Sequence, residues 1–183
     1  MLSKCDKHPT GIYVRILLEL GLRCSELCGL KWSDFDFANN TVTIREAVTG
    51  SDTASFVDKP KTASSKRVIP ISQELSDKLQ QIAPDEKDSY IIISRANQKM
   101  TPAHFMDRRM VSFYKFIDWP EPLRLTPHEL RHTCGTLLYE KTHDIYAVSK
   151  FLGHSGIEIT TKYYVHSNVE SLRAALDDED DED

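Results

Sequence analysis

Apolar residues recur three and four positions apart along several parts of the chain, which is the pattern of amphipathic helices. A first stripe ends near Gly21, a second helix begins at Ser25 or the turn before it, and Ser72 caps a third. Thr101-Pro102 repeats the cap-and-proline signal for a helix that reaches about Asp118. The stripes that we expect to face a core comprise Ile12, Ile16, Leu17, Leu20, Leu27, Leu30, Leu75, Leu79, Ile82, Phe105, Met106, Met110, Phe113 and Ile117. They predict a mainly helical protein.

From Thr41 the period changes from that of a helix to the alternation of a strand. Three short strands are predicted, at Thr41–Val48, Ser55–Asp58 and Arg67–Ile71, with a turn at Gly50–Asp52. They would form a small three-stranded antiparallel sheet. The apolar run Tyr90–Ile93 is compatible with either type of element.

The last third of the chain opens with a clear sequence signal for the start of a helix. Thr126 suits the N-cap, Pro127 suits the first helical position, and Glu129 completes a capping box. In that register His128 and Arg131 lie on one face, three residues apart. An apolar stripe runs beside them, formed by Leu130, Cys134, Leu137 and Leu138. One edge of the helix is therefore expected to pack, and the other to present a base and a cation.

A second helix in this part follows Asp144 as its cap and ends at Gly153, which leaves His154 just past the terminus. Its apolar residues are Ile145, Val148, Phe151 and Leu152. A third short segment carries Thr160, Thr161, Tyr163, Tyr164 and His166. We expect two imidazoles, a guanidinium and a phenol to converge here.

Length and composition are those of one domain with a core, at 183 residues and 40% hydrophobic content. The sequence shows neither an 18-residue apolar run nor a signal peptide, so we expect a cytoplasmic protein with no membrane partner. The four cysteines lack a framework spacing, and we expect reduced thiols, with Cys24 and Cys28 buried.

The net charge of −5 is unevenly distributed. Residues 177–183 hold seven of the 28 acidic residues and no basic ones, so residues 1–176 carry 23 minus 21 charges, or +2. A run of like charge at a terminus is typical of a disordered tail. A body near neutrality is compatible with a local basic cleft and therefore with a nucleic-acid partner.

Five motifs, taken in order, resemble those of one family. Gly21-Leu22-Arg23-x-Ser25-Glu26-Leu27 resembles the first arginine motif of the tyrosine recombinases, the phage integrase family. Lys59-Pro60-Lys61-Thr62 before Ser65-x-Arg67-x-Ile69-Pro70 resembles its catalytic-lysine hairpin. His128-x-x-Arg131, Leu152-Gly153-His154 and Tyr164-x-His166 resemble its C-terminal half.

The resemblance implies the catalytic domain of a site-specific recombinase, mainly α with a small three-stranded antiparallel sheet. Family members usually carry a helical DNA-clamping domain before this one, and only about twenty residues precede Arg23 here. We therefore expect a single catalytic domain over residues 1–176, without the clamping domain, followed by the acidic tail. The implied partner is double-stranded DNA, bound by a tetramer of the full-length protein, with accessory DNA-bending or directionality proteins possible.

The implied chemistry is phosphoryl transfer without a metal, a cofactor or ATP. Arg23 and Arg131 would bind the nonbridging phosphate oxygens, because a guanidinium is a planar fork that stays charged. The other implied roles are Tyr164 as nucleophile with a 3'-phosphotyrosyl intermediate, His128 as base, His154 as a further donor, Lys61 (with Lys59 second) as the acid for the leaving 5'-hydroxyl, and Glu26 as the group that orients Arg23.

Several alternatives stay open at this point. Arg23 and Glu26 could be an ordinary surface ion pair, worth a few tenths of a kcal/mol. His128-Glu129-Leu130-Arg131-His132 matches the zinc-protease motif HExxH, although Pro127 puts it in the first turn of a helix, where Glu129 is occupied as a cap. A DNA-binding module without turnover would share every feature except a working Tyr164, and a type IB topoisomerase-like relaxase would use the same residues. Arg108 and Arg109 could contact the DNA backbone or simply lie on a solvated face.

Overall fold

The computed structural model describes residues 2–51, 54–58, 66–93, 99–154 and 156–164. The acidic segment 177–183 lies outside the described residues, as do Lys59, Lys61 and His166. None of the helices in the described part of the chain is both long and apolar enough to cross a membrane. All four cysteines are free thiols, and Cys28 is buried as predicted, whereas Cys24 is only partly covered.

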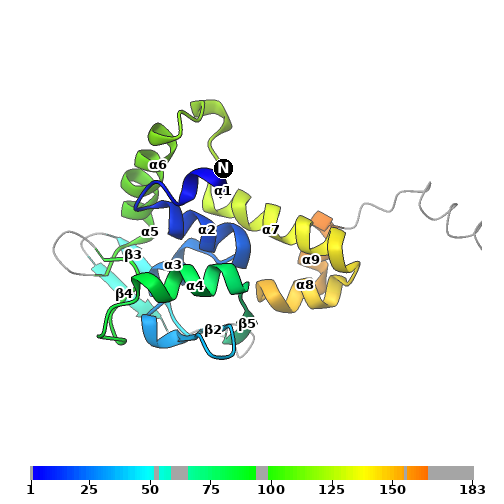
Figure 1. Cartoon of the computed structure of the whole chain (residues 1–183). Helices are drawn as coiled ribbons and strands as arrows, with labels where there is room; N and C mark the ends of the chain where they lie inside the picture. The colour runs from blue at the N-terminus through cyan, green and yellow to red at the C-terminus, as the bar shows by residue number, and fades with distance from the viewer. Residues whose placement is uncertain (1, 52–53, 59–65, 94–98, 155, 165–183) are drawn as a thin grey trace, which may run out of the picture.

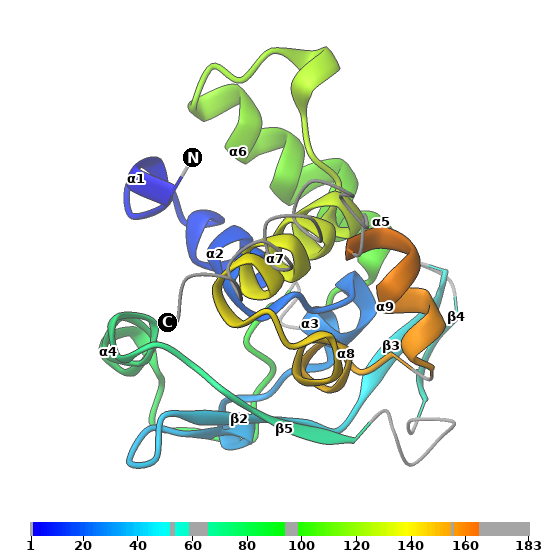
Figure 2. The same cartoon turned by 90° about the vertical axis from the view of Figure 1, so that its right-hand side faces the viewer.

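The predicted helices form close to the predicted boundaries. The α-helices of the described chain are α1 (Leu2–Cys5), α2 (Gly11–Leu20), α3 (Cys24–Gly29), α4 (Gln73–Ile82), α5 (Pro102–His104), α6 (Val111–Phe116), α7 (Pro127–Thr142), α8 (Ile145–Leu152) and α9 (Ile157–Tyr164). Short 3-10 turns, η1 (Trp32–Asp34) and η4 (Glu121–Leu123), join some of them. Figures 1 and 2 show α7 running beside α2, with α8 and α9 at its far end. The candidate active-site residues therefore lie where α7 meets α8 and α9.

The strands pair differently from the prediction. A three-stranded antiparallel sheet exists, but its order is β1 (Phe35–Asp36), β2 (Thr41–Ile44) and β5 (Arg67–Pro70). The remaining strands, β3 (Ala47–Ser51) and β4 (Ala54–Asp58), form a separate hairpin. The alternation from Thr41 to Val48 was read as one strand, whereas Arg45 and Glu46 lie in neither β2 nor β3. The third place in the sheet goes to β1, whose two residues are too few for a periodic signal.

The main core lies between α2, the three-stranded sheet and the helices that follow the sheet in the chain. Among its fully buried side chains are Ile16, Leu17, Phe105 and Phe113, and each contributes roughly 1.5–3 kcal/mol by leaving water. A smaller cluster of Cys134, Val148 and Leu152 joins α7 to α8. This second cluster fixes the end of α8 against the middle of α7.

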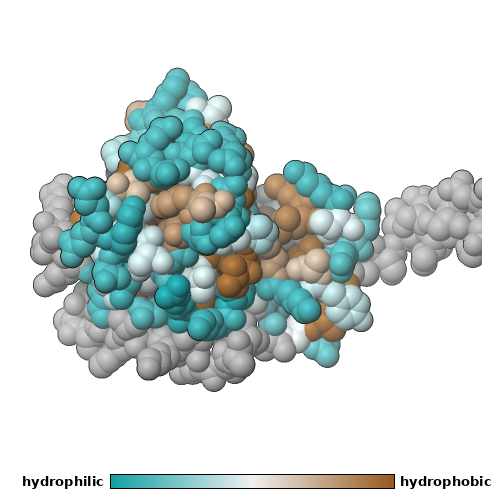
Figure 3. Space-filling view, turned by 60° about the horizontal axis from the view of Figure 1, so that its bottom comes forward, coloured by the Kyte–Doolittle hydropathy of each residue, from teal (hydrophilic) through white to brown (hydrophobic). Residues whose placement is uncertain are grey.

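Three residues that we expected to face the core are exposed. Ile82, the last residue of α4, is 52% exposed. Met106 is 39% exposed because residues Phe105–Met110 form a π-helical stretch (η3), in which a period of 3.6 no longer predicts the buried face. Leu137 is 46% exposed because its half of α7 extends beyond the main core. Figure 3 shows hydrophobic residues among polar ones on the face of the molecule that it draws.

Candidate active site

The start of α7 has the predicted cap, and the cap fixes where Arg131 lies. Thr126 Oγ1 accepts a hydrogen bond from the Glu129 amide, and Glu129 Oε2 accepts one from the Thr126 amide at 2.6 Å. Arg131, one turn further, is 4% exposed. Its Nη1 donates to Gly21 O at 2.6 Å and its Nη2 to Leu152 O at 2.7 Å. This arginine therefore links α7 to the ends of two other helices.

Both of those helices end in a left-handed glycine. Gly21 closes α2 with φ of 57°, and Gly153 closes α8 with φ of 70°. The last carbonyls of a helix have no partner within it, and a nearby cation is favoured by the helix dipole. Arg131 meets Gly21 O, while Arg23 Nη2 donates to Gly153 O at 3.2 Å. The two helix ends are thus joined through guanidinium groups.

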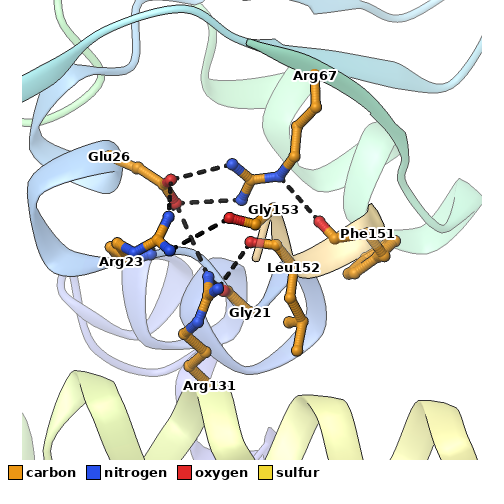
Figure 4. A network of polar contacts seen from close by, with 8 residues as sticks. All are labelled: Gly21, Arg23, Glu26, Arg67, Arg131, Phe151, Leu152 and Gly153. Carbon is orange, nitrogen blue, oxygen red and sulfur yellow. Dashed lines mark hydrogen bonds and ion pairs between the residues drawn. The ribbon is translucent and has the colours of Figure 1, made fainter. Parts of the chain in front are cut away.

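Glu26 lies at the centre of the arginines, as Figure 4 shows. Its carboxylate accepts from Arg23 Nη1 at 2.9 Å and from both terminal nitrogens of Arg67, at 3.0 and 3.1 Å. Arg131 Nη1 lies 4.0 Å from Oε2. Burial alone would raise the pKa of Glu26, but Arg67 and the Arg23 amide outweigh it, so the net pKa is lowered. Glu26 is therefore ionised at neutral pH. Because its side chain is only 6% exposed, its pairing with Arg23 is not an ordinary surface ion pair.

The cluster carries excess positive charge. Three guanidinium groups surround a single carboxylate, so these four described residues carry a formal net charge of +2. Arg67 and Arg131 have side chains 8% and 4% exposed, whereas that of Arg23 is 44% exposed. Such a site suits an anion, and Arg23 is the most open of the three arginines to it.

His154 follows the end of α8, and its side chain contacts α9. Its Nδ1 lies 2.7 Å from Thr160 Oγ1, and Thr160 is completely buried. Burial, reinforced by the charges of Arg131 and Arg23, lowers the pKa of His154 to about 4. The imidazole is therefore neutral at physiological pH. A neutral imidazole whose Nδ1 accepts a hydrogen bond can donate one through Nε2.

His128 does not join the arginines through a hydrogen bond within the described residues. Its ring is exposed and its Nε2 lies 2.9 Å from that of His132, with the rings edge to face at 4.3 Å. Burial, followed by the charges of His128 and Arg131, lowers the pKa of His132. The expectation that His128 and Arg131 share one face is thus met in spacing only, because Arg131 turns inward.

The zinc-protease alternative finds no support in the described geometry. Glu129 is occupied as the N-terminal cap of α7, which leaves it poorly placed as a general base. Within residues 2–51, 54–58, 66–93, 99–154 and 156–164, three potential metal-ligating side chains nowhere converge.

The two candidate lysines and the side chain of the predicted nucleophile lie outside the part of the chain that the structure describes. Lys59 and Lys61 lie outside the described residues. The backbone of Tyr163 and Tyr164 forms the end of α9, and the description does not extend to their side chains. The roles of these residues therefore remain predictions.

Two residues of the site were named within sequence motifs but were given no role there. Arg67 pairs with Glu26 and also donates through Nε to Phe151 O at 2.9 Å, and Thr160 contacts His154. A signal for Arg67 existed, because alternation puts it on the same side of its strand as buried Ile69, while Val68 is 63% exposed. An arginine on the core-facing side of a strand needs a buried partner. Thr160 offered no comparable signal.

A cavity of about 550 Å³ adjoins this cluster. It is lined on one side by β5 and on the other by α8 and the residues after it, namely Arg67, Val68, Ile69, Pro70, Ala147, Lys150, Phe151, Gly153 and His154. Two members of the site, Arg67 and His154, thus border an open space.

Comparison with known proteins gives consistent matches along almost the whole chain. The sequence model of the phage integrase family matches residues 1–171. The transposase from transposon Tn916 of Enterococcus faecalis is 27% identical over 189 residues, covering 95% of this chain and 47% of the transposase. Tyrosine recombinase XerA of Thermococcus onnurineus is 31% identical over 165 residues, covering 87% of this chain and 51% of the recombinase. The chain therefore spans about half the length of these curated relatives.

The solved structures agree. The Tn1549 transposon integrase in complex with circular intermediate DNA is 28% identical, with a TM-score of 0.79 over 96% of this chain and 63% of that one. The catalytic domain of bacteriophage HP1 integrase, at 24% identity, has a TM-score of 0.59 and covers 96% of this chain and 87% of its own. The latter likeness supports the fold, which is mainly helical with a small three-stranded antiparallel sheet, as predicted.

Proposed function

The chain belongs to the phage integrase family, and on this premise we propose that it is the catalytic domain of a site-specific tyrosine recombinase, which cleaves and rejoins double-stranded DNA. The observation that carries the proposal is the arginine cluster around Glu26. Three guanidinium groups and one carboxylate leave two positive charges, at the ends of two helices and beside a cavity.

This charge distribution suits phosphoryl transfer. A phosphodiester is anionic and gains charge in the transition state, so preorganised donors stabilise the transition state more than the ground state. Arg131 is held by two main-chain carbonyls, and Arg23 is held by Glu26 and Gly153. Guanidinium planes fixed in this way need little rearrangement when a phosphate binds. We assign the nonbridging oxygens to Arg23 and Arg131, with His154 as a neutral third donor.

The proposed reaction is a transesterification with no net change in bond number. The phenol oxygen of Tyr164 attacks phosphorus, its proton passes to His128, and the bond from phosphorus to the 5'-oxygen breaks. Lys61 donates the proton that the leaving 5'-oxygen needs. The 3'-phosphotyrosyl bond keeps the energy of the diester, so a different 5'-hydroxyl can reverse the step without ATP.

The register of α9 supports Tyr164 over its neighbour. Thr160 contacts His154, so its side of the helix faces the residue that follows the end of α8. With 3.6 residues per turn, position 164 lies about 40° from Thr160 around the helix axis, and position 163 about 60° away on the other side. The Tyr-x-His ending that Tyr164 makes with His166 favours the same residue.

We propose double-stranded DNA as the partner. The solved Tn1549 integrase, which is similar along 96% of this chain, is bound to circular intermediate DNA. A tetramer of the full-length protein on DNA, with accessory DNA-bending or directionality proteins, is the arrangement in which two duplexes could exchange strands.

A suicide DNA substrate tests the proposal. A nick next to the scissile phosphate lets the short 5'-hydroxyl strand diffuse away, which traps any covalent protein–DNA adduct. We expect adducts on the cognate site in buffer containing EDTA, because arginines and a lysine supply the positive charge.

Three results would contradict this assignment. Binding without adduct at any protein concentration would indicate a DNA-binding module that lacks turnover. Adduct formation that disappears in EDTA and returns with zinc or magnesium would indicate a metal-dependent mechanism. Relaxation of plasmids without sequence preference would instead favour a type IB topoisomerase-like relaxase.

A further inference from the structure

Arg67 is the one arginine of the cluster that the proposed reaction leaves without a role. It lies at the start of β5, opposite Ile44, and its side chain is 8% exposed. All three of its nitrogen atoms donate to groups of the protein. Nη1 and Nη2 bind the two oxygens of Glu26, and Nε binds Phe151 O.

Those contacts join three separate parts of the chain. Glu26 belongs to α3, Phe151 to α8, and Arg67 to the three-stranded sheet. Through Glu26, Arg67 reaches Arg23, whose Nη1 shares Oε1 with Arg67 Nη1. Through Phe151, it reaches the end of α8, where Leu152 O binds Arg131 and His154 follows Gly153. One guanidinium is thus connected to every proposed phosphate donor.

We propose that Arg67 is a positioning residue for strand cleavage. It holds the Glu26 carboxylate and the carbonyl end of α8 in a single frame, so that Arg23, Arg131 and His154 converge on one phosphate. This inference rests on the proposed function, and it assigns Arg67 no contact with DNA.

The geometry requires an arginine at this position. A fork with five donors can bind both carboxylate oxygens while a third nitrogen binds a carbonyl on its other edge. A lysine keeps the charge, but its single nitrogen cannot reach Phe151 O and both oxygens of Glu26 together. Gly153 packs closely against this guanidinium. A Cβ at that residue would lie 2.8 Å from Arg67 Nη1, so a larger residue would displace the fork.

Without the fork, the charges would rearrange. Glu26 is buried and ionised, so it would draw more strongly on Arg23 and on Arg131, whose Nη1 is already 4.0 Å away. Both arginines would then be turned from the phosphate toward the carboxylate. The expected defect is therefore in the chemical step rather than in DNA binding.

The test compares Arg67→Lys with Arg45→Lys in the full-length recombinase. Arg45 is a matched control, because it follows Ile44, the pairing partner of Arg67, and forms its own ion pair with the buried Asp34 at 3.2 Å. The measurements are the single-turnover rate and the final amplitude of adduct formation on a suicide substrate at saturating protein, the Kd for the site, and the Tm. A displacement of about 1 Å costs up to a hundredfold in rate, so we expect Arg67→Lys to slow adduct formation by about tenfold to a hundredfold.

A positioning role predicts a pattern that mere loss of stability does not. In Arg67→Lys the adduct amplitude should stay complete and the Kd should change less than about threefold, a free-energy change of about 0.6 kcal/mol, while Arg45→Lys reacts like wild type. The variant Glu26→Gln should be slow as well, and the double variant no slower than the slower single one, because both act through the same contact. The proposal would be overturned if the rate reductions of the two single variants multiplied in the double variant. It would also be overturned if Arg67→Lys reduced the amplitude and left the rate unchanged.

Nuclear magnetic resonance of the chain without DNA gives an answer that does not depend on turnover. The imidazole nitrogen signals of His154, assigned with a His154→Gln variant, should shift in Arg67→Lys and stay in place in Arg45→Lys. Unshifted signals would refute the positioning role even if the wild type proved inactive. A wild type that forms no adduct would instead refute the proposed function.

Discussion

Individual arginines at this site are held by main-chain atoms as much as by charge. Arg131 is buried, and a buried guanidinium is stable only when its donors are bound and its charge is balanced. The carbonyls of Gly21 and Leu152 bind it, and Glu26 lies near. The same residue therefore supports the fold and supplies charge to the proposed reaction.

Arg131→Lys should be far more damaging than Arg108→Lys. Arg108 is exposed, and its replacement should leave stability and adduct formation near wild type. At Arg131 a lysine loses at least one charge-assisted hydrogen bond, worth about 1.5–3 kcal/mol, and it loses the planar fork for the phosphate. Urea unfolding and single-turnover cleavage measure the two effects. Equal and mild effects at both positions would show that Arg131 contributes only general charge.

His154 should make stability depend on pH. Its pKa is about 4 in the folded chain and about 6.5 when unfolded. Between these values the unfolded chain binds more protons, so stability is fully present above pH 6.5 and falls as the pH is lowered toward 4. His154→Gln should therefore show a flatter Tm over this range. Part of the slope should persist, since the pKa values of His8 and His132 are also lowered. An unchanged slope would contradict the burial of a neutral His154.

At the scale of elements, helix ends build the site. Two left-handed glycines stop α2 and α8, and the terminal carbonyls of these helices face Arg23, which precedes α3, and the arginines of β5 and α7. The helix ends therefore satisfy two needs at once, because orphan carbonyls gain donors and the guanidinium groups gain fixed orientations.

Gly153→Ala should destabilise the chain and slow cleavage. The left-handed conformation costs a residue with a Cβ about 1–2 kcal/mol, and the new methyl group would also press on Arg67. Gly156→Ala is the control, because a Cβ there meets only the flexible carboxylate of Glu158. Urea denaturation should place Gly153→Ala lower in stability than Gly156→Ala. Similar stability of the two variants would argue against the tight end of α8.

Local signals explain which elements could be predicted from sequence. The caps at Ser72, Thr126 and Asp144 are bonds between a side chain and an amide two or three residues away, so the sequence alone reveals them. Arg67 bonds to residues 41 and 84 positions away, and β1 depends on pairing rather than on its own pattern. Such contacts are set by the tertiary fold. The family resemblance supplied candidates for the reaction, and the geometry added the residues that orient them.

At the scale of the whole molecule, the charged cluster occupies one junction of a small domain. The described arginines Arg23, Arg67 and Arg131 concentrate positive charge where α2, α3, α7 and α8 meet. This local concentration is compatible with a net charge of −5 for the full chain, since binding depends on the field at the site.

DNA binding by this chain alone should be weak and steeply dependent on salt. Few phosphates can be contacted by a single domain, and each contact releases a counterion, so log K should fall with log salt at about −0.9 per phosphate. A titration of the cognate duplex between low and physiological salt measures this slope. Tight binding that is insensitive to salt would contradict an interface based on phosphate contacts.

The most direct test of the central claim is the identity of the tyrosine that bonds to DNA. The adduct trapped on a nicked suicide substrate is digested with protease, and the peptide attached to the 3'-phosphate is identified by mass spectrometry, for the wild type, Tyr163→Phe and Tyr164→Phe. We predict linkage at Tyr164, adduct in Tyr163→Phe and none in Tyr164→Phe. Linkage at Tyr163, or an adduct that persists in Tyr164→Phe, would contradict the assignment.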